Sequence, residues 1–165
     1  MDSKAAAKAA CETLIGLGHK DFVIVGGDRN VSDTSRLRFD GCMKVLEQHG
    51  VDFDRKKDYK AIRFSYQDGY DATRQLLESG RRFTALFAVA DVIAIGAIRA
   101  LRDNGLQVPE DVSVMGYDGL TLGDYLVPQL STVNQSVELL AKRSTDILLD
   151  CVENEEDCKA NSLPF

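Results

Sequence analysis

The chain has 165 residues, of which 44% are apolar and 28% are charged, and its formal net charge is −6 at pH 7. These values are typical of a single globular domain and exclude a disordered or fibrous protein. No apolar run approaches the roughly 20 residues of a membrane-spanning helix, and no signal pattern opens the chain, so we expect a soluble, cytoplasmic protein without a membrane partner. The excess of acidic over basic residues, 26 to 20, argues against binding of DNA by this chain alone.

The first helix is predicted to begin at Asp2 or Ser3, and its apolar stripe is Ala6, Ala10, Leu14 and Leu17. Gly18 has the position of a C-terminal glycine that ends such a helix. The two histidines, His19 and His49, each stand beside a glycine, so we expect them to have capping or turn roles.

The cysteines do not form a metal-binding or disulfide pattern in the sequence. There are four, at positions 11, 42, 151 and 158, without a CxxC pair or a nearby histidine, so we expect no metal site. Cys42 and Cys151 lie on apolar helical stripes. We therefore predict that they pack as small hydrophobic residues in a reducing cytosol.

Residues 22–25 have the composition of a short buried strand, which closes on Gly26 and Gly27. Neither a GxGxxG motif nor a P-loop follows, so no nucleotide cofactor is expected. After a polar loop over 28–35, the next helix has an inner face of Phe39, Cys42, Met43 and Leu46 and stops at Gly50. Arg36 and Arg38 lie near its first turn, where a cation opposes the helix dipole, although an ordinary solvated or salt-bridged arginine is also consistent with this position.

Two further strand–helix units follow. Residues 59–64 are predicted to form a strand that ends in Phe64, and Ser65 with Asp68 resembles the capping box of a helix that ends before Gly80. On composition alone, Phe64 is a core residue or an exposed stacking face. Residues 84–89 are predicted to be a buried strand, followed by a helix over 92–104 that Asp91 caps and Gly105 ends.

The segment 108–119 is predicted to contain a turn, a buried strand over 112–115, and then Gly116, Tyr117 and Asp118. Ligands of open parallel sheets bind beyond the carboxyl ends of the strands, which makes Asp118 a candidate ligand contact; an Asx-turn is the alternative. After an irregular stretch over 120–128 comes a helix over 137–152. Its apolar side is Val137, Leu140, Ala141, Ile147, Leu148 and Cys151. An acidic connector over 153–157 and a strand-like end at 163–165 follow. The alternation predicts a three-layer α/β/α fold with a mainly parallel sheet.

Four segments resemble the effector-binding domain of the LacI/GalR family of bacterial transcription regulators. They are VPEDVSVMGYDG at 108–119, GHKDFVIVGG at 18–27, SRLRFDGCMK at 35–44 and TALFAVADVIAIGAIRALRDNG at 84–105. The resemblance implies a periplasmic binding protein type I-like fold with a flavodoxin-like subdomain. Residues 1–135 would be the C-terminal subdomain, and 136–165 the crossover helix and a truncated strand of the other subdomain. The DNA-binding domain would be absent.

The resemblance also implies a ligand site. Arg38, three residues before Gly41, would reach into the effector cleft, Asp118 and Gln135 would make polar contacts, and Phe64 would stack on the ligand. Ser32, Thr34 and Asp91 are further candidates, although Gln135 has an alternative bridging role and Asp91 one as a cap. Many sugar-responsive members have Asn where this chain has Ala90, which argues against a lactose- or galactose-like binding mode.

The leading hypothesis is a ligand-sensing domain. A small metabolite, expected to be a sugar or similar polar effector, would bind between two lobes and change the affinity of an attached helix-turn-helix for operator DNA. The resemblance implies a homodimer, with an apolar contact at Leu120, Leu122, Tyr125 and Leu126. Because one wall of the cleft would be missing, we expect weak ligand binding by this chain alone.

Two other classes share the fold. A solute-binding protein of a sugar transporter is disfavoured by the absent signal and by the regulator-like 109–118 segment. A phospho-acceptor receiver lacks the acidic cluster after its first strand, and no Lys follows Asp118 closely. A hydrolase lacks a GxSxG elbow, and neither histidine has an obvious acidic and nucleophilic partner, so no enzyme is expected.

Overall fold

A computed structural model describes residues 2–153 of the chain. Its sheet has five parallel strands in the order β2-β1-β3-β4-β5. The strands are β1 (Phe22–Gly26), β2 (Tyr59–Ala61), β3 (Ala85–Ala88), β4 (Ser113–Asp118) and β5 (Ser131–Asn134). The helices are α1 (Ser3–Gly16), α2 (Asp33–Gln48), α3 (Tyr66–Glu78), α4 (Asp91–Asp103) and α5 (Val137–Glu153), with a short 3₁₀ helix η1 (Thr121–Tyr125). This strand order is that of a doubly wound, flavodoxin-like sheet.

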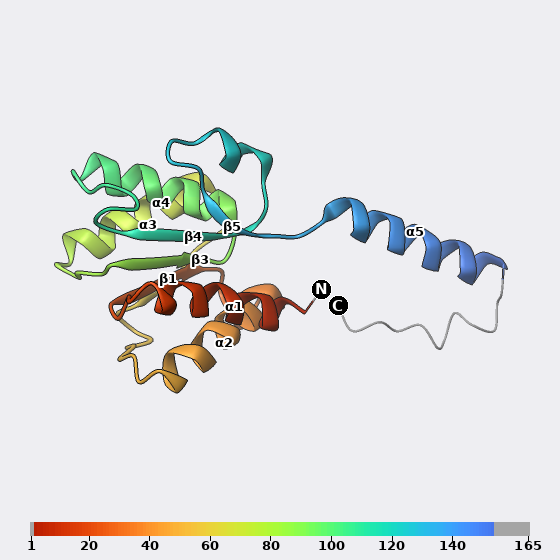
Figure 1. The fold of residues 1–165 in the computed structure, drawn as a ribbon, viewed down its shortest axis with the longest axis horizontal. Coiled ribbons are helices and arrows are strands. Elements are labelled where there is room, and N and C mark those ends of the chain that lie inside the picture. The colour runs from red at the N-terminus through yellow and green to blue at the C-terminus, as the bar shows by residue number, and fades with distance from the viewer. Residues whose placement is uncertain (1, 154–165) are drawn as a thin grey trace.

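The predicted three-layer α/β/α fold is confirmed. Helices α1 and α2 cover one face of the sheet, and α3 and α4 cover the other (Figure 1). Every residue of β1 and β3 is buried, because these central strands have helices on both sides. Their near-continuous apolar sequences are what a parallel strand in such a position requires.

Helix α1 begins where it was predicted, but its apolar stripe is shifted. The side chain of Asp2 accepts hydrogen bonds from the backbone N–H groups of Lys4 and Ala5, which makes Asp2 the N-cap. The predicted inner residue Leu17 is 69% exposed, because the helix ends at Gly16 and Leu17 follows it as the C-cap. Gly18 has a φ of 92°, as expected for a C-terminal glycine.

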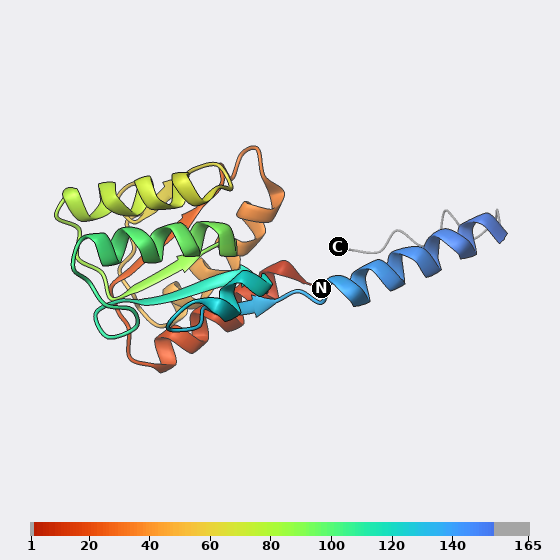
Figure 2. The ribbon, with the colours of Figure 1, turned by 90° about the horizontal axis from the view of Figure 1, so that it is seen from above.

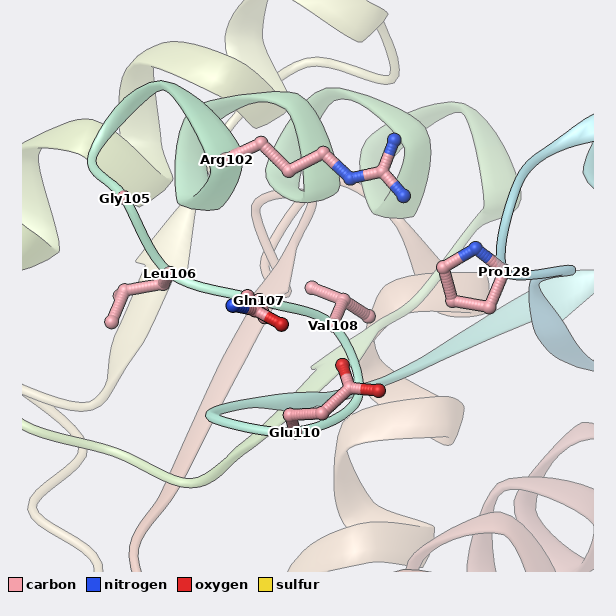
Figure 3. A pocket seen from close by; sticks show the side chains of 7 residues that line it. All are labelled: Arg102, Gly105, Leu106, Gln107, Val108, Glu110 and Pro128. Atoms are coloured by element: carbon pink, nitrogen blue, oxygen red, sulfur yellow. The ribbon is translucent and has the colours of Figure 1, made fainter.

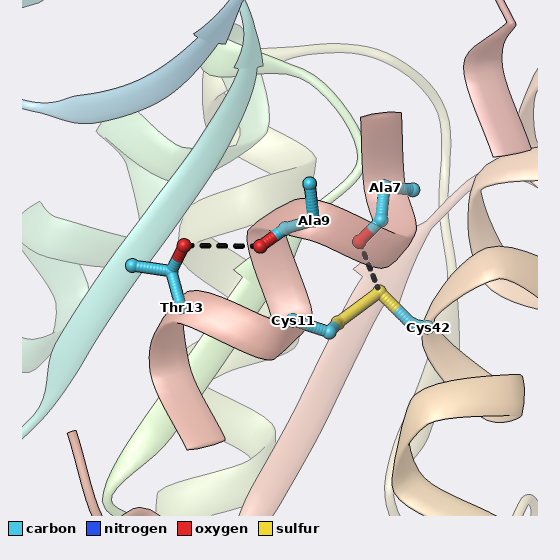
Figure 4. The surroundings of a disulfide bond; sticks show 5 residues. All are labelled: Ala7, Ala9, Cys11, Thr13 and Cys42. Atoms are coloured by element: carbon cyan, nitrogen blue, oxygen red, sulfur yellow. Dashed lines mark hydrogen bonds between the residues drawn. A yellow bond between two sulfur atoms is a disulfide. The ribbon is translucent and has the colours of Figure 1, made fainter. Parts of the chain in front are cut away.

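The prediction of reduced cysteines is wrong for one pair. Cys11 on α1 and Cys42 on α2 form a disulfide across the two helices, with their Cα atoms 5.5 Å apart (Figure 4). Gly41 lets the helices approach this closely, since an added Cβ there would lie 3.2 Å from the Cβ of Ala7 and closer still to the carbonyl of Lys4. The two cysteines are 31 positions apart, and the sequence spacing contains no sign of this juxtaposition.

Two element boundaries differ from the prediction. The strand expected over 59–64 ends at Ala61, and Phe64 lies in the connection to α3. The N-cap of α4 is Ala90, which makes no side-chain capping bond, and Asp91 is the first helical residue. Asp91 was therefore wrongly predicted as the cap. The predicted capping box of α3 is present, since the N–H of Asp68 donates to Ser65 Oγ at 3.0 Å.

Helix α5 leaves the body of the molecule and extends away from it in both views (Figures 1 and 2). Most of its apolar side chains are exposed, including Val137, Leu140 and Leu148 of the predicted apolar side, while Ile147 and Cys151 are partly exposed. The predicted strand at 163–165 and all but the first residue of the acidic connector lie outside the described residues. Within 2–153, no helix is long and apolar enough to cross a membrane.

Candidate ligand-binding site

The parallel sheet brings segments that are distant in sequence together at its carboxyl edge. The register pairs Asp118 at the end of β4 with Asn134 at the end of β5, so Gln135 follows directly beside it. Helix α2 begins after the loop that follows β1, at the same edge of the sheet. Arg38, near the start of this helix, therefore reaches Asp118 at the end of β4. We use the term candidate site for Arg38, Phe64, Asp118 and Gln135.

Three of these side chains are in direct contact. Arg38 Nη1 lies 3.1 Å from Asp118 Oδ1, and Gln135 Nε2 donates a hydrogen bond to the same oxygen at 2.7 Å. The backbone N–H of Gln135 also donates to the carbonyl of Asp118 at 3.2 Å. Both of these contacts are with Oδ1, and the Asp118 side chain is 33% exposed.

Arg38 is held in place from several sides. Only 5% of it is exposed, and Nη1 donates to the carbonyl of Val89 after β3. Its guanidinium carbon lies 3.6 Å from the ring centroid of the fully buried Tyr117. A guanidinium over an aromatic face is stabilised by the ring quadrupole, more strongly where water is excluded. Arg38 is therefore a buried, salt-bridged cation at the carboxyl edge; of the ordinary alternatives, the salt-bridged arginine applies and the solvated one does not.

Asp118 has an unusual backbone and an unusual acidity. Its φ of 122° lies in the region that favours glycine, and it is the only non-glycine residue with positive φ in the described part of the chain. Burial raises the pKa of the Asp118 carboxyl, while Arg38 and the hydrogen bond from Gln135 oppose the rise. Strained backbones and perturbed carboxylates concentrate at functional sites.

Phe64 lies against the carboxyl end of β1. A side chain at Gly27 would meet Phe64 Cε2 at 2.8 Å and Ser35 Oγ at 2.6 Å, so the ring lies against the end of β1. Phe64 is 44% exposed. The alternative that Phe64 is a core residue is therefore wrong, and part of an aromatic face is open at the carboxyl edge.

Of the other candidate residues, Ser32 and Asp91 have structural roles and Thr34 is exposed. Ser32 is the N-cap of α2 and accepts the N–H of Ser35 at 3.2 Å. Thr34 is exposed in the first turn of the same helix. Asp91 is fully buried, and its two oxygens accept hydrogen bonds from the N–H of Leu120 and the hydroxyl of Thr132. None of these hydrogen bonds is to Arg38, Phe64, Asp118 or Gln135 itself.

Sequence reasoning missed two residues. Ser35 is fully buried, and its hydroxyl accepts the N–H of Gly27 at 2.9 Å, which fixes the end of β1 beside Phe64. The second is Tyr117, whose ring packs against the guanidinium of Arg38. A signal for Ser35 exists, since it lies three residues before Arg38 and so on the same helical face. The stacking on Tyr117 has no sequence signal.

A pocket lined by the end of α4, the loop that follows it and Pro128 is not at this edge. It encloses about 390 Å³ beside the end of α4 and the start of β4 (Figure 3). Arg102, which lines it, already donates a hydrogen bond to the carbonyl of Val127. His19 lies at the same amino edge of the sheet, where its Nδ1 is 3.0 Å from Thr84 Oγ1 and its Nε2 is 2.9 Å from Ser113 Oγ. The predicted turn role of His19 therefore understates its contacts with β4 and with the residue before β3.

Apolar side chains are exposed around η1. Tyr125 is 79% exposed, and Leu120, Leu122 and Val127 are exposed as well. Leu126, which was predicted to share this surface, is partly buried and packs against the core. We refer to Leu120, Leu122, Tyr125 and Val127 as the η1 surface.

Comparison with known proteins identifies the family. Residues 11–164 match the periplasmic binding protein-like domain family. A crystal structure of a LacI family transcriptional regulator from Enterococcus faecium with bound ribose is 30% identical, with a TM-score of 0.86, and the match covers 94% of this chain and 57% of that one. The chain belongs to the LacI family, in its periplasmic-binding-protein-like effector-binding domain.

Other LacI-family relatives agree. The HTH-type transcriptional repressor PurR of Haemophilus influenzae is 35% identical over 148 residues, or 90% of this chain and 44% of PurR. The Lac repressor dimer bound to operator and the anti-inducer ONPF is 30% identical, with a TM-score of 0.86, over 93% of this chain and 45% of the repressor. The chain thus spans about half the length of these relatives. Both of these relatives are transcriptional repressors.

Proposed function

We propose that this LacI-family chain binds a small polyhydroxylated effector, a sugar, at the candidate site and so controls the binding of operator DNA by a helix-turn-helix outside the chain. The observation that carries the proposal is the convergence of Arg38, Gln135 and Asp118. The guanidinium is a donor, and the second oxygen of Asp118 is an acceptor. Neighbouring sugar hydroxyls, each both donor and acceptor, complement this pair.

Phe64 supports the same ligand class. Its side chain lies against Gly27 and is 44% exposed, and an aromatic face packs well against the apolar side of a sugar ring. Ribose is bound in the Enterococcus faecium relative, which fits a sugar of similar size. Ala90 has no side-chain hydrogen-bonding group, so it contributes no hydroxyl contact at the end of β3.

The candidate site is one wall of a cleft in this proposal. Residues 1–135 form the C-terminal subdomain, and 136–165, with the exposed apolar side of α5, belong to the other subdomain. Closure of that subdomain over the ligand changes the arrangement of the attached DNA-binding domain. Two copies pair through the η1 surface, as expected for a family whose Lac repressor is dimeric on its operator. Such a regulator works in the cytoplasm, beside its operator.

A thermal-shift screen of the complete regulator tests the proposal. The panel contains pentoses, hexoses, disaccharides and purine bases. We expect at least one sugar to raise the melting temperature of the wild type, and Arg38→Met to abolish the shift. Arg99→Met is the matched control, because Arg99 is an exposed arginine on α4 that pairs only with Asp103 in the described residues. A shift by purine bases alone, or by no member of the panel, would overturn the proposed ligand class.

A further inference from the structure

We propose that Asp91 is a positioning residue that holds Asp118 in its ligand-binding orientation without contacting the ligand. The inference rests on the proposed function in so far as Asp118 binds the effector. Asp91 is fully buried, so a ligand at the carboxyl edge cannot reach its carboxylate. A buried carboxylate is costly unless it is hydrogen-bonded, and each of its oxygens has a protein donor.

The two donors to Asp91 lie on the two segments that carry Asp118 and Gln135. Asp91 Oδ2 accepts the N–H of Leu120 at 2.7 Å, two residues after Asp118. Asp91 Oδ1 accepts the hydroxyl of Thr132 at 2.6 Å, three residues before Gln135. One carboxylate in the first turn of α4, where the helix dipole favours a negative charge, therefore joins the end of β4 to β5.

Thr132 extends this connection to the residue next to Asp118. Its hydroxyl oxygen accepts the N–H of Gly119 at 3.3 Å while its proton is donated to Asp91. The two residues that follow Asp118 are thus both fixed, directly or through Thr132, by Asp91. Asp118 itself has a φ of 122°, and a non-glycine residue keeps such a conformation only where its surroundings impose it.

Gly116 makes room for the carboxylate. A Cβ at position 116 would lie 3.3 Å from Asp91 Cγ and closer still to Oδ1. The glycine in the β4 sequence SVMGYD is therefore explained by the side chain of α4 that packs against it. Gly116 thus leaves room for Asp91, and Asp91 and Thr132 together fix the backbone that follows Asp118.

The experiment uses the 165-residue chain with Asp91→Asn and, separately, Thr132→Val. In Asp91→Asn the amide oxygen can accept from only one of the two donors, so the other donor loses its acceptor, and in Thr132→Val both hydroxyl bonds are lost. Amide hydrogen exchange is followed by NMR. We expect the Gly119 and Leu120 amides to exchange at least tenfold faster in both variants, and the Gln135 side-chain amide to lose its protected signal. The amides of β1 and β3 should keep their protection.

Matched controls separate positioning from general stability. Asp103→Asn removes a carboxylate from the other end of α4, and Thr145→Val removes a hydroxyl from α5, so neither should alter Gly119, Leu120 or Gln135. Unchanged exchange at Gly119 and Leu120 in both test variants, or equal acceleration across the whole sheet, would overturn the inference. If one variant does not fold, the other decides.

A second experiment measures the affinity of the complete regulator for ribose and for the sugars that raise its melting temperature. We expect Asp91→Asn to lower the affinity at least tenfold and Asp103→Asn to leave it unchanged. Equal affinity in wild type and Asp91→Asn would overturn the positioning role. If no sugar binds the wild type while the exchange results hold, the proposed function fails and the positioning of Asp118 stands.

Discussion

The two edges of the sheet are both tied by polar side chains, but in different ways. At the amino edge, the His19 ring joins the hydroxyls of Thr84 and Ser113, and all three groups can be neutral. At the carboxyl edge, the buried cation of Arg38 meets Asp118, whose backbone lies in the region that favours glycine. Neutral contacts hold a scaffold at little electrostatic cost, whereas buried charge and backbone strain need compensation.

The pKa values of His19 and Asp118 shift in opposite directions for the same reason, which is burial. Burial lowers the pKa of His19 and raises the pKa of Asp118, so in both cases the folded protein disfavours the charged form. For His19 the neutral form is the one present at neutral pH. For Asp118 burial disfavours the carboxylate, which is the form that pairs with Arg38. A residue kept in such a state is a sign of function rather than of stability.

The largest expected effect follows from removal of the carboxylate. Asp118→Ala leaves the Arg38 guanidinium buried without its counter-ion, and we expect a loss of roughly 2–4 kcal/mol in the free energy of unfolding. The value is below that of a fully buried pair because the Asp118 side chain is 33% exposed. Urea unfolding measures it. Asp118→Asn, which still accepts hydrogen bonds from Arg38 and Gln135, should lose less; equal stability of Asp118→Ala and wild type would contradict the description of the carboxyl edge.

A smaller effect is expected at the amino edge. His19→Ala leaves two hydroxyls without their partner, which should cost about 1 kcal/mol. Because the pKa of His19 is lowered below 6.5, the unfolded chain binds a proton first as the pH falls. The stabilising contribution of His19 is therefore complete above pH 6.5 and is lost as the pH falls through the folded pKa. Unfolding at pH 7.5 and 5.5 should show a smaller difference between His19→Ala and wild type at the lower pH.

The smallest expected effect is a difference in pKa between Asp118 and Asp103. The pKa of Asp118 lies above 3.8 because of burial, whereas the hydrogen bond from Arg99 lowers the pKa of the exposed Asp103. A carbon-detected NMR titration of the side-chain carboxyls should give the higher value for Asp118. As the pH falls toward 3.8, Asp118 takes up its proton earlier in the folded chain, so its burial destabilises the fold less there than at neutral pH. The reverse order of the two values would contradict the assignment of burial to Asp118.

Much of the fold follows from the sequence. The buried strands at 22–25 and 84–89 and the glycines after each helix predict the parallel α/β layers, because central strands and helix ends have strong local signals. The convergence of Arg38, Asp118 and Gln135 follows from the shared direction of the strands.

What failed depends on contacts between distant segments. The Cys11–Cys42 disulfide requires the crossing point of α1 and α2, which no local pattern records. Asp91 has the sequence position of a helix cap, yet its side chain turns to Leu120 and Thr132 on other elements. Leu17 continues the spacing of the α1 stripe, but the helix ends before it. Periodicity predicts which residues share a face and leaves open what that face meets.

A crystal structure of the complete regulator with the sugar of largest thermal shift tests the central claim most directly. We predict a sugar with hydroxyls within hydrogen-bonding distance of Arg38 and Asp118 and with one face against Phe64. A sugar bound instead at the amino edge, in the pocket beside Arg102, would contradict the assignment of the ligand site to the carboxyl edge.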